Sequence, residues 1–273
     1  MDNEKYFPYP GGVIIDFEGL DCSFKETNAK ALIVRMNKKF NYNPVVFQSF
    51  PRYGNEVCKP IEKWLQGKYD RRVLMNHPQA IDTLYSIDRF DFWYSYIDNY
   101  TVLNMASFKN TMRSFLFIFD RYTISNAIYN PMYGDMPTVD DFTFDNKVFA
   151  IPNPDIVIWM RMKNFEAFKI ILQNKKNKDR NESDIEFIKK VWDRSEYAIE
   201  NKLFEKTGIH LIVIDCLDEC DPEDYDETLV EDYTSTQVRK LGYRIKGKDE
   251  LENEIWNKVT NYFIENYKNS EGK

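Results

Sequence analysis

One stretch decides the fold of this chain: Val13-Ile14-Ile15-Asp16-Phe17-Glu18-Gly19-Leu20-Asp21-Cys22-Ser23-Phe24-Lys25-Glu26-Thr27. Its first residues form an apolar run that is typical of a buried strand. Residues 28–36 follow with a helical pattern, whose apolar face is Ala29, Leu32, Ile33 and Met36. A strand, a tight loop, a lysine and a helix in this order predict a phosphate-binding loop. In such a loop, backbone N–H groups and the helix N-terminus hold the anion.

The loop departs from the usual pattern G-x-x-x-x-G-K-[ST]. Gly19 and Lys25 are present, but Phe24 stands at the second glycine and Glu26 at the hydroxyl residue that binds Mg²⁺. Because the backbone must approach phosphate closely at that glycine, Phe24 has to turn its ring away. Glu26 offers oxygen ligands that suit Mg²⁺ directly. Thr27 lies about 100° further around the helix and is a poor substitute. The pattern alone leaves a strand–turn–helix without a ligand as an alternative.

The composition limits the class of protein. The chain has 273 residues, of which 43% are hydrophobic, and this is ample for one large core. It has no run of about 18 apolar residues, so we expect no membrane span. Its first residues lack the basic-then-apolar form of a secretion signal. A net charge of −7 argues against binding of polymeric nucleic acid, which needs a basic face. An enzyme of phosphorylated small molecules needs only local positive charge and is allowed.

The cysteines and histidines argue against a zinc site. The chain has two histidines, and none of its four cysteines form a Cys-x-x-Cys pair: Cys22, Cys58, Cys216 and Cys220. Reduced thiols in a cytoplasm are the natural interpretation. Because Cys22 falls at a helix N-terminus, we expect a lowered pKa and a thiol that is reactive toward alkylating agents.

Further along the chain, apolar runs alternate with helical patterns. The runs that predict strands lie at 44–47, 115–119, 155–160 and 209–214. The helical patterns lie near 57–65, from 78 onward, at 163–173, at 183–205 and at 251–263. This alternation predicts a single domain, 1–273, with a three-layer αβα sandwich, a five-stranded parallel sheet and right-handed crossovers. Segments 130–150 and 216–245 lack a pattern, and we expect an irregular insertion and a surface loop there.

Charged residues mark two further candidate contacts with a ligand. Asp120-Arg121-Tyr122 directly follows a buried strand, and ligands of parallel sheets lie outside the carboxyl ends of the strands. The alternative is an Asp–Arg pair that fixes a loop. The cationic segment 174–182 is either a mobile lid that closes over phosphates or a solvated loop.

Six motifs occur in a fixed order along the chain: Phe17-Glu18-Gly19-Leu20-Asp21, Phe50-Pro51-Arg52-Tyr53, Tyr85-Ser86-Ile87-Asp88-Arg89, Asp120-Arg121-Tyr122-Thr123-Ile124-Ser125, Pro152-Asn153-Pro154-Asp155 and Asp179-Arg180-Asn181-Glu182. Together they resemble the thymidylate kinase family over about residues 13–215. These are P-loop NTPases of the nucleoside monophosphate kinase type that phosphorylate dTMP. The resemblance implies ATP and Mg²⁺ as cofactors, nucleotide substrates and a homodimer.

The resemblance also implies roles for matching residues. Catalysis would fall to Lys25, Arg121 and Arg180, and Mg²⁺ would lie near Asp21 and Glu26. The donor nucleotide would lie against Gly19, Cys22, Ser23, Phe24, Lys25, Glu26 and Thr27. The acceptor would lie against Asp21, Arg52, Tyr85, Arg89, Asp120, Arg121 and Tyr129. Among these, Arg89 and Arg121 would clamp the acceptor phosphate and Tyr85 would stack on the base. The alternatives are an ion pair of Arg89 with Asp88 or Asp91, and a core position for Tyr85.

The departures from the family leave more than one function open. Related enzymes carry Gly or Arg at Cys22, so this chain has no P-loop arginine, and its lid has lysines, which lack the bidentate geometry of arginine. The leading hypothesis is phosphorylation of dTMP to dTDP. Its rival is a nucleotide-binding protein without catalysis that serves a regulatory or partner-binding role. A third hypothesis is a kinase for another deoxynucleotide or a nucleoside.

Overall fold

The computed structural model describes residues 13–40, 45–70, 77–104, 116–130, 136–178, 181–223 and 232–271. Within these ranges no helix combines the length and the apolar character that a membrane crossing requires. The predicted lid residues Asp179 and Arg180 lie outside the described residues.

Five parallel strands form the central sheet: β1 Val13–Gly19, β2 Val45–Ser49, β3 Leu116–Asp120, β4 Ile156–Arg161 and β5 His210–Asp215. Their order is β2-β3-β1-β4-β5, so β1 lies at the centre between β3 and β4. All residues of β1 and β3 are buried, as expected for parallel strands covered on both faces. The predicted five-stranded parallel sheet is confirmed.

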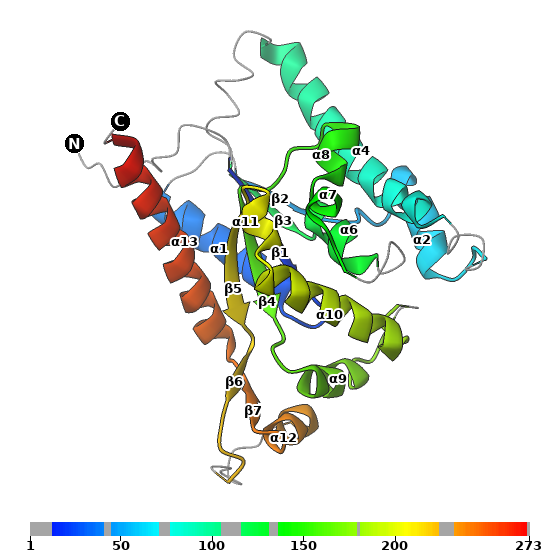
Figure 1. Ribbon diagram of the computed structural model, residues 1–273. Helices are drawn as coiled ribbons and strands as arrows, with labels where there is room; N and C mark the ends of the chain where they lie inside the picture. The colour runs from blue at the N-terminus through cyan, green and yellow to red at the C-terminus, as the bar shows by residue number, and fades with distance from the viewer. Residues whose placement is uncertain are drawn as a thin grey trace.

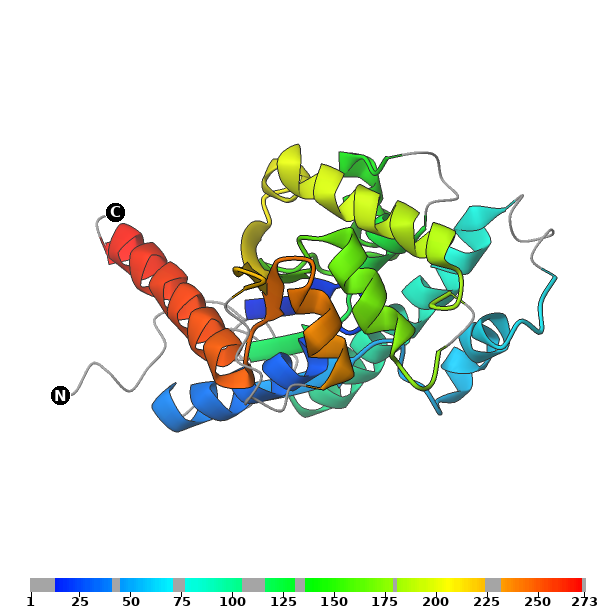
Figure 2. The same ribbon diagram turned by 90° about the horizontal axis from the view of Figure 1, so that it is seen from below.

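Helices cover both faces of the sheet and form the two outer layers (Figures 1 and 2). One face carries α1 Lys25–Phe40 and α13 Lys248–Glu271, which lie side by side. The Arg35 side chain joins them, because its Nη1 donates to Asn253 Oδ1 at 2.9 Å. The other face carries α4 Pro78–Asn104, α6 Thr123–Tyr129, α10 Ile185–Glu200 and α11 Leu203–Lys206. Shorter helices between these elements include η1 Glu56–Cys58, α2 Lys59–Leu65 and α9 Phe165–Gln173.

A cluster of aromatic side chains fixes α4 against the sheet. Trp93 packs on Phe117 of β3 with 4.9 Å between ring centroids, and its Nε1 donates to the Tyr122 hydroxyl at 2.5 Å. Within the aromatic-rich stretch 90–100, Phe92 and Trp93 therefore belong to the core. Phe90 and Tyr94 are exposed and stack on each other.

The segment 130–150 is more regular than the sequence predicts. Its described part, 136–150, holds α7 Val139–Phe142 and α8 Phe144–Phe149. Thr138 begins α7 with a capping box, in which its hydroxyl and the Asp141 carboxylate satisfy each other's backbone N–H groups. The expectation of an irregular insertion is wrong here, because six-residue and four-residue helices are too short to give a clear periodic pattern.

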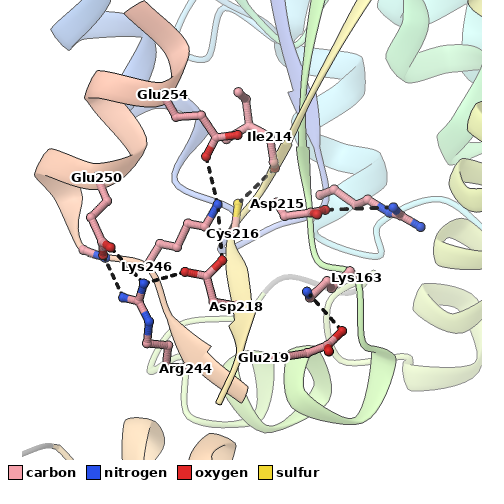
Figure 3. A network of polar contacts seen from close by, with 12 residues as sticks. Lys163, Ile214, Asp215, Cys216, Asp218, Glu219, Arg244, Lys246, Glu250 and Glu254 are labelled. Carbon is pink, nitrogen blue, oxygen red and sulfur yellow. Dashed lines mark hydrogen bonds and ion pairs between the residues drawn. The ribbon is translucent and has the colours of Figure 1, made fainter. Parts of the chain in front are cut away.

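The described part of 216–245 is also ordered, contrary to the predicted surface loop. It holds β6 Leu217–Glu219, α12 Tyr233–Arg239 and β7 Tyr243–Ile245, and β6 pairs with β7 in antiparallel fashion. We call this unit the appendage. Figure 3 shows the charges that tie it to α13: Lys246 Nζ lies 2.8 Å from Glu254, and Arg244 lies 2.8 Å from Glu250. Asp218 of β6 joins both cations. The appendage therefore links the end of β5 to the start of α13.

Candidate active site

The chain turns from β1 into α1 through residues 19–24, of which three have positive φ: Gly19, Cys22 and Phe24. Gly19 has φ 139°, and a Cβ there would lie 2.4 Å from the Met160 carbonyl oxygen, so only glycine fits. Cys22 and Phe24 have φ of 63° and 64°, a left-handed conformation that is unfavourable for residues with a Cβ. The loop is tightly curled although two of its positions with positive φ, Cys22 and Phe24, are not glycine.

The side chains of Phe24, Glu26 and Thr27 are exposed. The Phe24 side chain is 38% exposed, as expected for a ring that turns away from the loop. Glu26 lies on the solvent side of α1, where its Oε1 accepts a hydrogen bond from Lys30 Nζ at 2.5 Å. Ser23, in contrast, is fully buried.

Lys25 is folded onto its own loop. Its Nζ donates to the Leu20 carbonyl oxygen at 2.6 Å and to Ser23 Oγ at 3.4 Å. Burial and the neighbouring charge of Arg121 lower the pKa of Lys25 to about 8. In a phosphate-binding loop, the lysine at this position is the residue whose ammonium reaches the outer phosphates.

Arg121 joins the loop to α6 through an ion pair with Asp21. Burial raises the pKa of Asp21, but the charges of Arg121, Lys25 and Lys175 outweigh this and leave it below its usual value. Asp21 is therefore a charged carboxylate. Lys175, at the start of the predicted lid, also pairs with Glu182.

Tyr129 forms a wall beside this ion pair. The Arg121 guanidinium carbon lies 4.6 Å from the centroid of the Tyr129 ring. The Tyr129 hydroxyl donates to the Gly19 carbonyl oxygen at 3.2 Å. The ring therefore connects the phosphate-binding loop to the end of α6.

Two carboxyl groups of β1 lie buried behind the loop. Glu18 accepts hydrogen bonds from the Tyr122 N–H at 2.9 Å and from Ser125 Oγ at 2.8 Å. Asp16 is fully buried, and neither of its carboxyl oxygens has a hydrogen-bond partner. Burial and the charge of Glu18 raise the pKa of Asp16 well above its usual value.

The donor set of this region fits Mg²⁺ bound through phosphates. In the described ranges, no group of three or more Asp, Glu, His or Cys residues is placed to hold a metal ion. Mg²⁺ in phosphoryl-transfer sites keeps several waters and uses one or two carboxylates besides the phosphates. Asp120 suits that role, because its Oδ2 accepts from Ser49 at 3.2 Å while its buried Oδ1 has no hydrogen-bond partner. Glu26 is exposed and paired with Lys30.

A pocket of about 140 Å³ opens beside the loop. Asp21 and Arg121 lie at its loop end, and Tyr85 and Arg89 of α4 contribute another wall. The further polar residues of its lining are Tyr53, Asp82, Ser125, Asn126, Tyr129, Asn130 and Asn181. The pocket brings together most of the residues predicted to bind the acceptor.

Two lining residues of this pocket, Arg89 and Asn126, belong to a hydrogen-bonded cluster that we call the deep cluster: Ser86, Arg89, Asn126 and Asp145. Arg89 is 1% exposed, and its Nη1 donates to Asp145 Oδ2 at 2.9 Å. Ser86 Oγ lies 2.5 Å from Asp145 Oδ1. Asn126 Nδ2 faces Ser86 Oγ at 3.2 Å and Asp145 Oδ1 at 3.5 Å. The charge of Arg89 is therefore matched by Asp145, and not by Asp88 or Asp91.

Arg52 lies outside the pocket lining. Its Nε donates to Asp88 Oδ1 at 2.7 Å, and its Nη2 donates to Asp91 Oδ2 at 2.6 Å. The two acceptors belong to α4, so Arg52 fixes the segment after β2 to that helix. The half-buried Tyr85 does line the pocket.

The expectation of a lowered pKa for the Cys22 thiol is wrong. Burial raises the pKa of Cys22, and the opposing charge of Lys175 does not compensate. The helix N-terminus was expected to stabilise a thiolate. Removal from water disfavours the thiolate more than the charges of Lys175 and Lys25 favour it.

The comparison with known proteins gives one family. A family model described as thymidylate kinase matches residues 17–219. The thymidylate kinase of Caenorhabditis elegans is 29% identical over 155 residues, which cover 54% of this chain and 62% of that protein. Among solved structures, the thymidylate kinase of Candida albicans has a TM-score of 0.47 at 18% identity and covers 75% of this chain and 84% of its own. The enzyme of Ehrlichia chaffeensis has a TM-score of 0.47 at 19% identity, with coverage of 75% and 93%.

Proposed function

Because the chain belongs to the thymidylate kinase family, we propose that it transfers the γ-phosphoryl group of ATP to dTMP and uses Mg²⁺. Phosphoryl transfer needs little covalent chemistry, and it depends on positioning and on positive charge around the moving group. The described site supplies Lys25 and Arg121 for this purpose, and Lys175 lies close enough to influence the pKa of Asp21. Arg180 remains a proposed catalytic residue on the strength of its motif.

One observation carries this proposal: the Arg121–Asp21 ion pair belongs both to the phosphate-binding loop and to the pocket. A monophosphate at the loop end of the pocket would meet Arg121, whose planar fork suits phosphate. That position is next to Lys25, since the charge of Arg121 is a leading cause of the low Lys25 pKa. Donor and acceptor phosphates would thus meet between these two cations, as a direct transfer requires.

The deep cluster supports thymine as the base. Asn126 Nδ2 faces three acceptor oxygens, which are Ser86 Oγ, an Asp145 carboxylate oxygen and the Asp82 carbonyl oxygen. If the amide were turned over, Asn126 Oδ1 would face these three acceptor oxygens and be repelled by them. The amide therefore presents Oδ1 to the base as a hydrogen-bond acceptor, and Arg89 presents a donor. The Asn126 acceptor matches the N3–H donor of thymine, and the Arg89 donor matches its O4 acceptor. In cytosine the two groups are reversed, because N3 is an acceptor and the amino group is a donor. We therefore propose that Arg89 reads the base and that Arg121 holds the acceptor phosphate.

Mg²⁺ would supply charge neutralisation between the donor phosphates. Asp120 and Asp21 are the carboxylates we propose to hold it, directly or through its waters. Lys25 would move from the Leu20 carbonyl oxygen to the phosphates when nucleotide enters.

A coupled assay of ADP release with ATP, Mg²⁺ and dTMP tests this function. We expect turnover with dTMP, less with dUMP, dGMP and dCMP, and a loss of about 10²–10³-fold in Lys25→Ala, which removes a cation from the transition state. Lys30→Ala, an exposed lysine of the same helix, is the matched control and should keep the wild-type rate. Absence of turnover above the Lys25→Ala level with every nucleotide would refute the proposal.

The rival hypothesis of a nucleotide-binding protein without catalysis was motivated by Phe24 and Glu26. Both side chains are exposed, and Glu26 is paired with Lys30, so neither obstructs the loop. The motivation for that rival is therefore weakened. The same substrate panel tests the third hypothesis, since faster turnover with a nucleotide other than dTMP would identify a different acceptor.

A further inference from the structure

We propose that Asp145 is a positioning residue that fixes which hydrogen-bonding groups the pocket presents to the base, and so selects thymine over cytosine. This inference rests on the proposed function, because it presumes a pyrimidine monophosphate in the pocket. Asp145 comes from α8 and is 3% exposed, and it does not itself line the pocket. It acts through the neighbours that do.

Asp145 is the only residue of the deep cluster bonded to all three others. Its Oδ2 accepts from Arg89 at 2.9 Å, and its Oδ1 lies 2.5 Å from Ser86 Oγ and 3.5 Å from Asn126 Nδ2. An ionised carboxylate can only accept hydrogen bonds. Each neighbour must therefore turn a donor toward Asp145, and this requirement orients all of them.

For Asn126 the consequence is a fixed amide. Ser86 has a single hydroxyl hydrogen, which it donates either to Asp145 or to the Asp82 carbonyl oxygen 2.9 Å away. Its Oγ therefore offers a lone pair to Asn126 and no hydrogen. With acceptors on every side, Asn126 cannot turn its Oδ1 inward without placing it against the carboxylate, and so Oδ1 stays toward the base.

For Arg89 the consequence is that its guanidinium is held in place and its charge is balanced by Asp145. The ion pair with Asp145 is buried on both sides, with side-chain exposures of 2%. Breaking such a pair leaves an uncompensated buried charge and is strongly unfavourable. Arg89 is thus held rigidly, and its matched charge makes it a donor to a neutral carbonyl oxygen rather than a partner for a phosphate.

Replacing the carboxylate by an amide removes the constraint. In Asp145→Asn the new NH₂ group can donate to Asn126, so the Asn126 amide can turn and present Nδ2 to the base. The pocket then accepts the N3 acceptor of cytosine. We expect the ratio of kcat/KM for dTMP to that for dCMP to fall at least about tenfold, the size of effect expected when a buried polar contact is mismatched. The change should appear mainly in KM.

Three variants separate positioning from mere structural support. Asp145→Glu keeps an acceptor-only group and should keep the substrate ratio even if both rates fall. Ser86→Ala removes one of the three acceptors around Asn126 Nδ2 and should also lower the ratio of kcat/KM for dTMP to that for dCMP. This variant keeps the test available if Asp145→Asn does not fold. Asp140→Asn is the matched control, since this exposed residue of α7 pairs only with Lys147 in the described structure.

An unchanged ratio in Asp145→Asn, or an equal fall for both substrates, would overturn the proposal. The outcome is distinguishable from failure of the proposed function. If the wild-type protein turns over no nucleotide, calorimetric binding of dTMP and dCMP to the same variants still measures the ratio. A wild-type protein that binds neither pyrimidine nucleotide would overturn both.

Discussion

Lys25 carries much of the proposed donor chemistry, and its protonation can be measured. Its pKa of about 8 comes mainly from burial, which disfavours the ammonium, with the charge of Arg121 acting in the same direction. Since the pKa is lowered, the charged form is present below about pH 8 and is lost as the pH rises through that value. Above that pH, a nucleotide that needs the ammonium binds more weakly, because Lys25 must first take up a proton.

We therefore expect the association constant for MgATP to fall about tenfold between pH 7 and pH 9. Calorimetric titration at half-unit intervals measures it. Lys25→Arg, whose guanidinium stays charged, should give a flat profile at whatever affinity it retains. A wild-type profile that stays flat to pH 9 would contradict this account of Lys25.

Residues whose partners lie close in sequence, or whose chemistry belongs to a motif, could be predicted. Lys25, Asp21 and Arg121 were predicted this way, and the structure brings them together. Asp145 could not be recognised, because it lies 56 residues from Arg89. Arg52 was predicted to contact the acceptor, yet it pairs with Asp88, which lies 36 residues away. Pairings across such distances depend on how helices pack, which no local pattern encodes.

At the scale of elements, the phosphate-binding loop holds two non-glycine residues in the left-handed region. Cys22 illustrates the cost, since a Cβ at φ 63° crowds the following carbonyl group. Gly19 occupies the position where close approach to Met160 makes glycine obligatory. The sequence pattern identified the loop but not which of its positions would be strained, because that depends on the path between β1 and α1.

We expect Cys22→Gly to raise the free energy of unfolding by about 0.5–1 kcal/mol, because glycine removes the strain at a small cost in chain entropy. Urea denaturation followed by circular dichroism measures the change. Cys22→Ala is the control that keeps the Cβ and loses the thiol. Equal effects of the two substitutions would mean that the thiol environment, and not the backbone, determines the stability at this position.

The strands were predictable because buried parallel strands consist of nearly continuous apolar runs. The short helices α7 and α8 were not, because they span only one or two turns. The predicted helix over 183–205 is divided into α10 and α11, with Lys202 between them at φ 53°. Nothing in the local composition marks that break.

At the scale of the whole molecule, the sheet and the appendage differ in how they are held. The sheet interior consists of fully buried strands between two helical layers. The appendage has two three-residue strands, and its contacts with α13 include partly exposed ion pairs of Arg244 with Glu250 and of Lys246 with Glu254. Such pairs contribute little to stability individually. The appendage should therefore open without unfolding the rest of the chain.

Hydrogen exchange followed by mass spectrometry tests this difference. We expect amides of β6 and β7 to exchange at least about 100-fold faster than those of β1 and β4, because local opening requires less free energy than global unfolding. Lys246→Met should accelerate exchange in the appendage and leave β1 unchanged. Equal protection of β7 and β1 would mean that the appendage unfolds only with the core.

The cations of the described site have internal partners before any nucleotide arrives: Lys25 has the Leu20 carbonyl oxygen, Arg121 has Asp21 and Arg89 has Asp145. An inhibitor that carries a phosphate must first displace some of these contacts, and part of its binding energy is spent on that exchange. A neutral heterocycle seated only against Arg89 and Asn126 avoids the exchange. Fragment screening against this protein should therefore favour uncharged lactams over phosphate mimics.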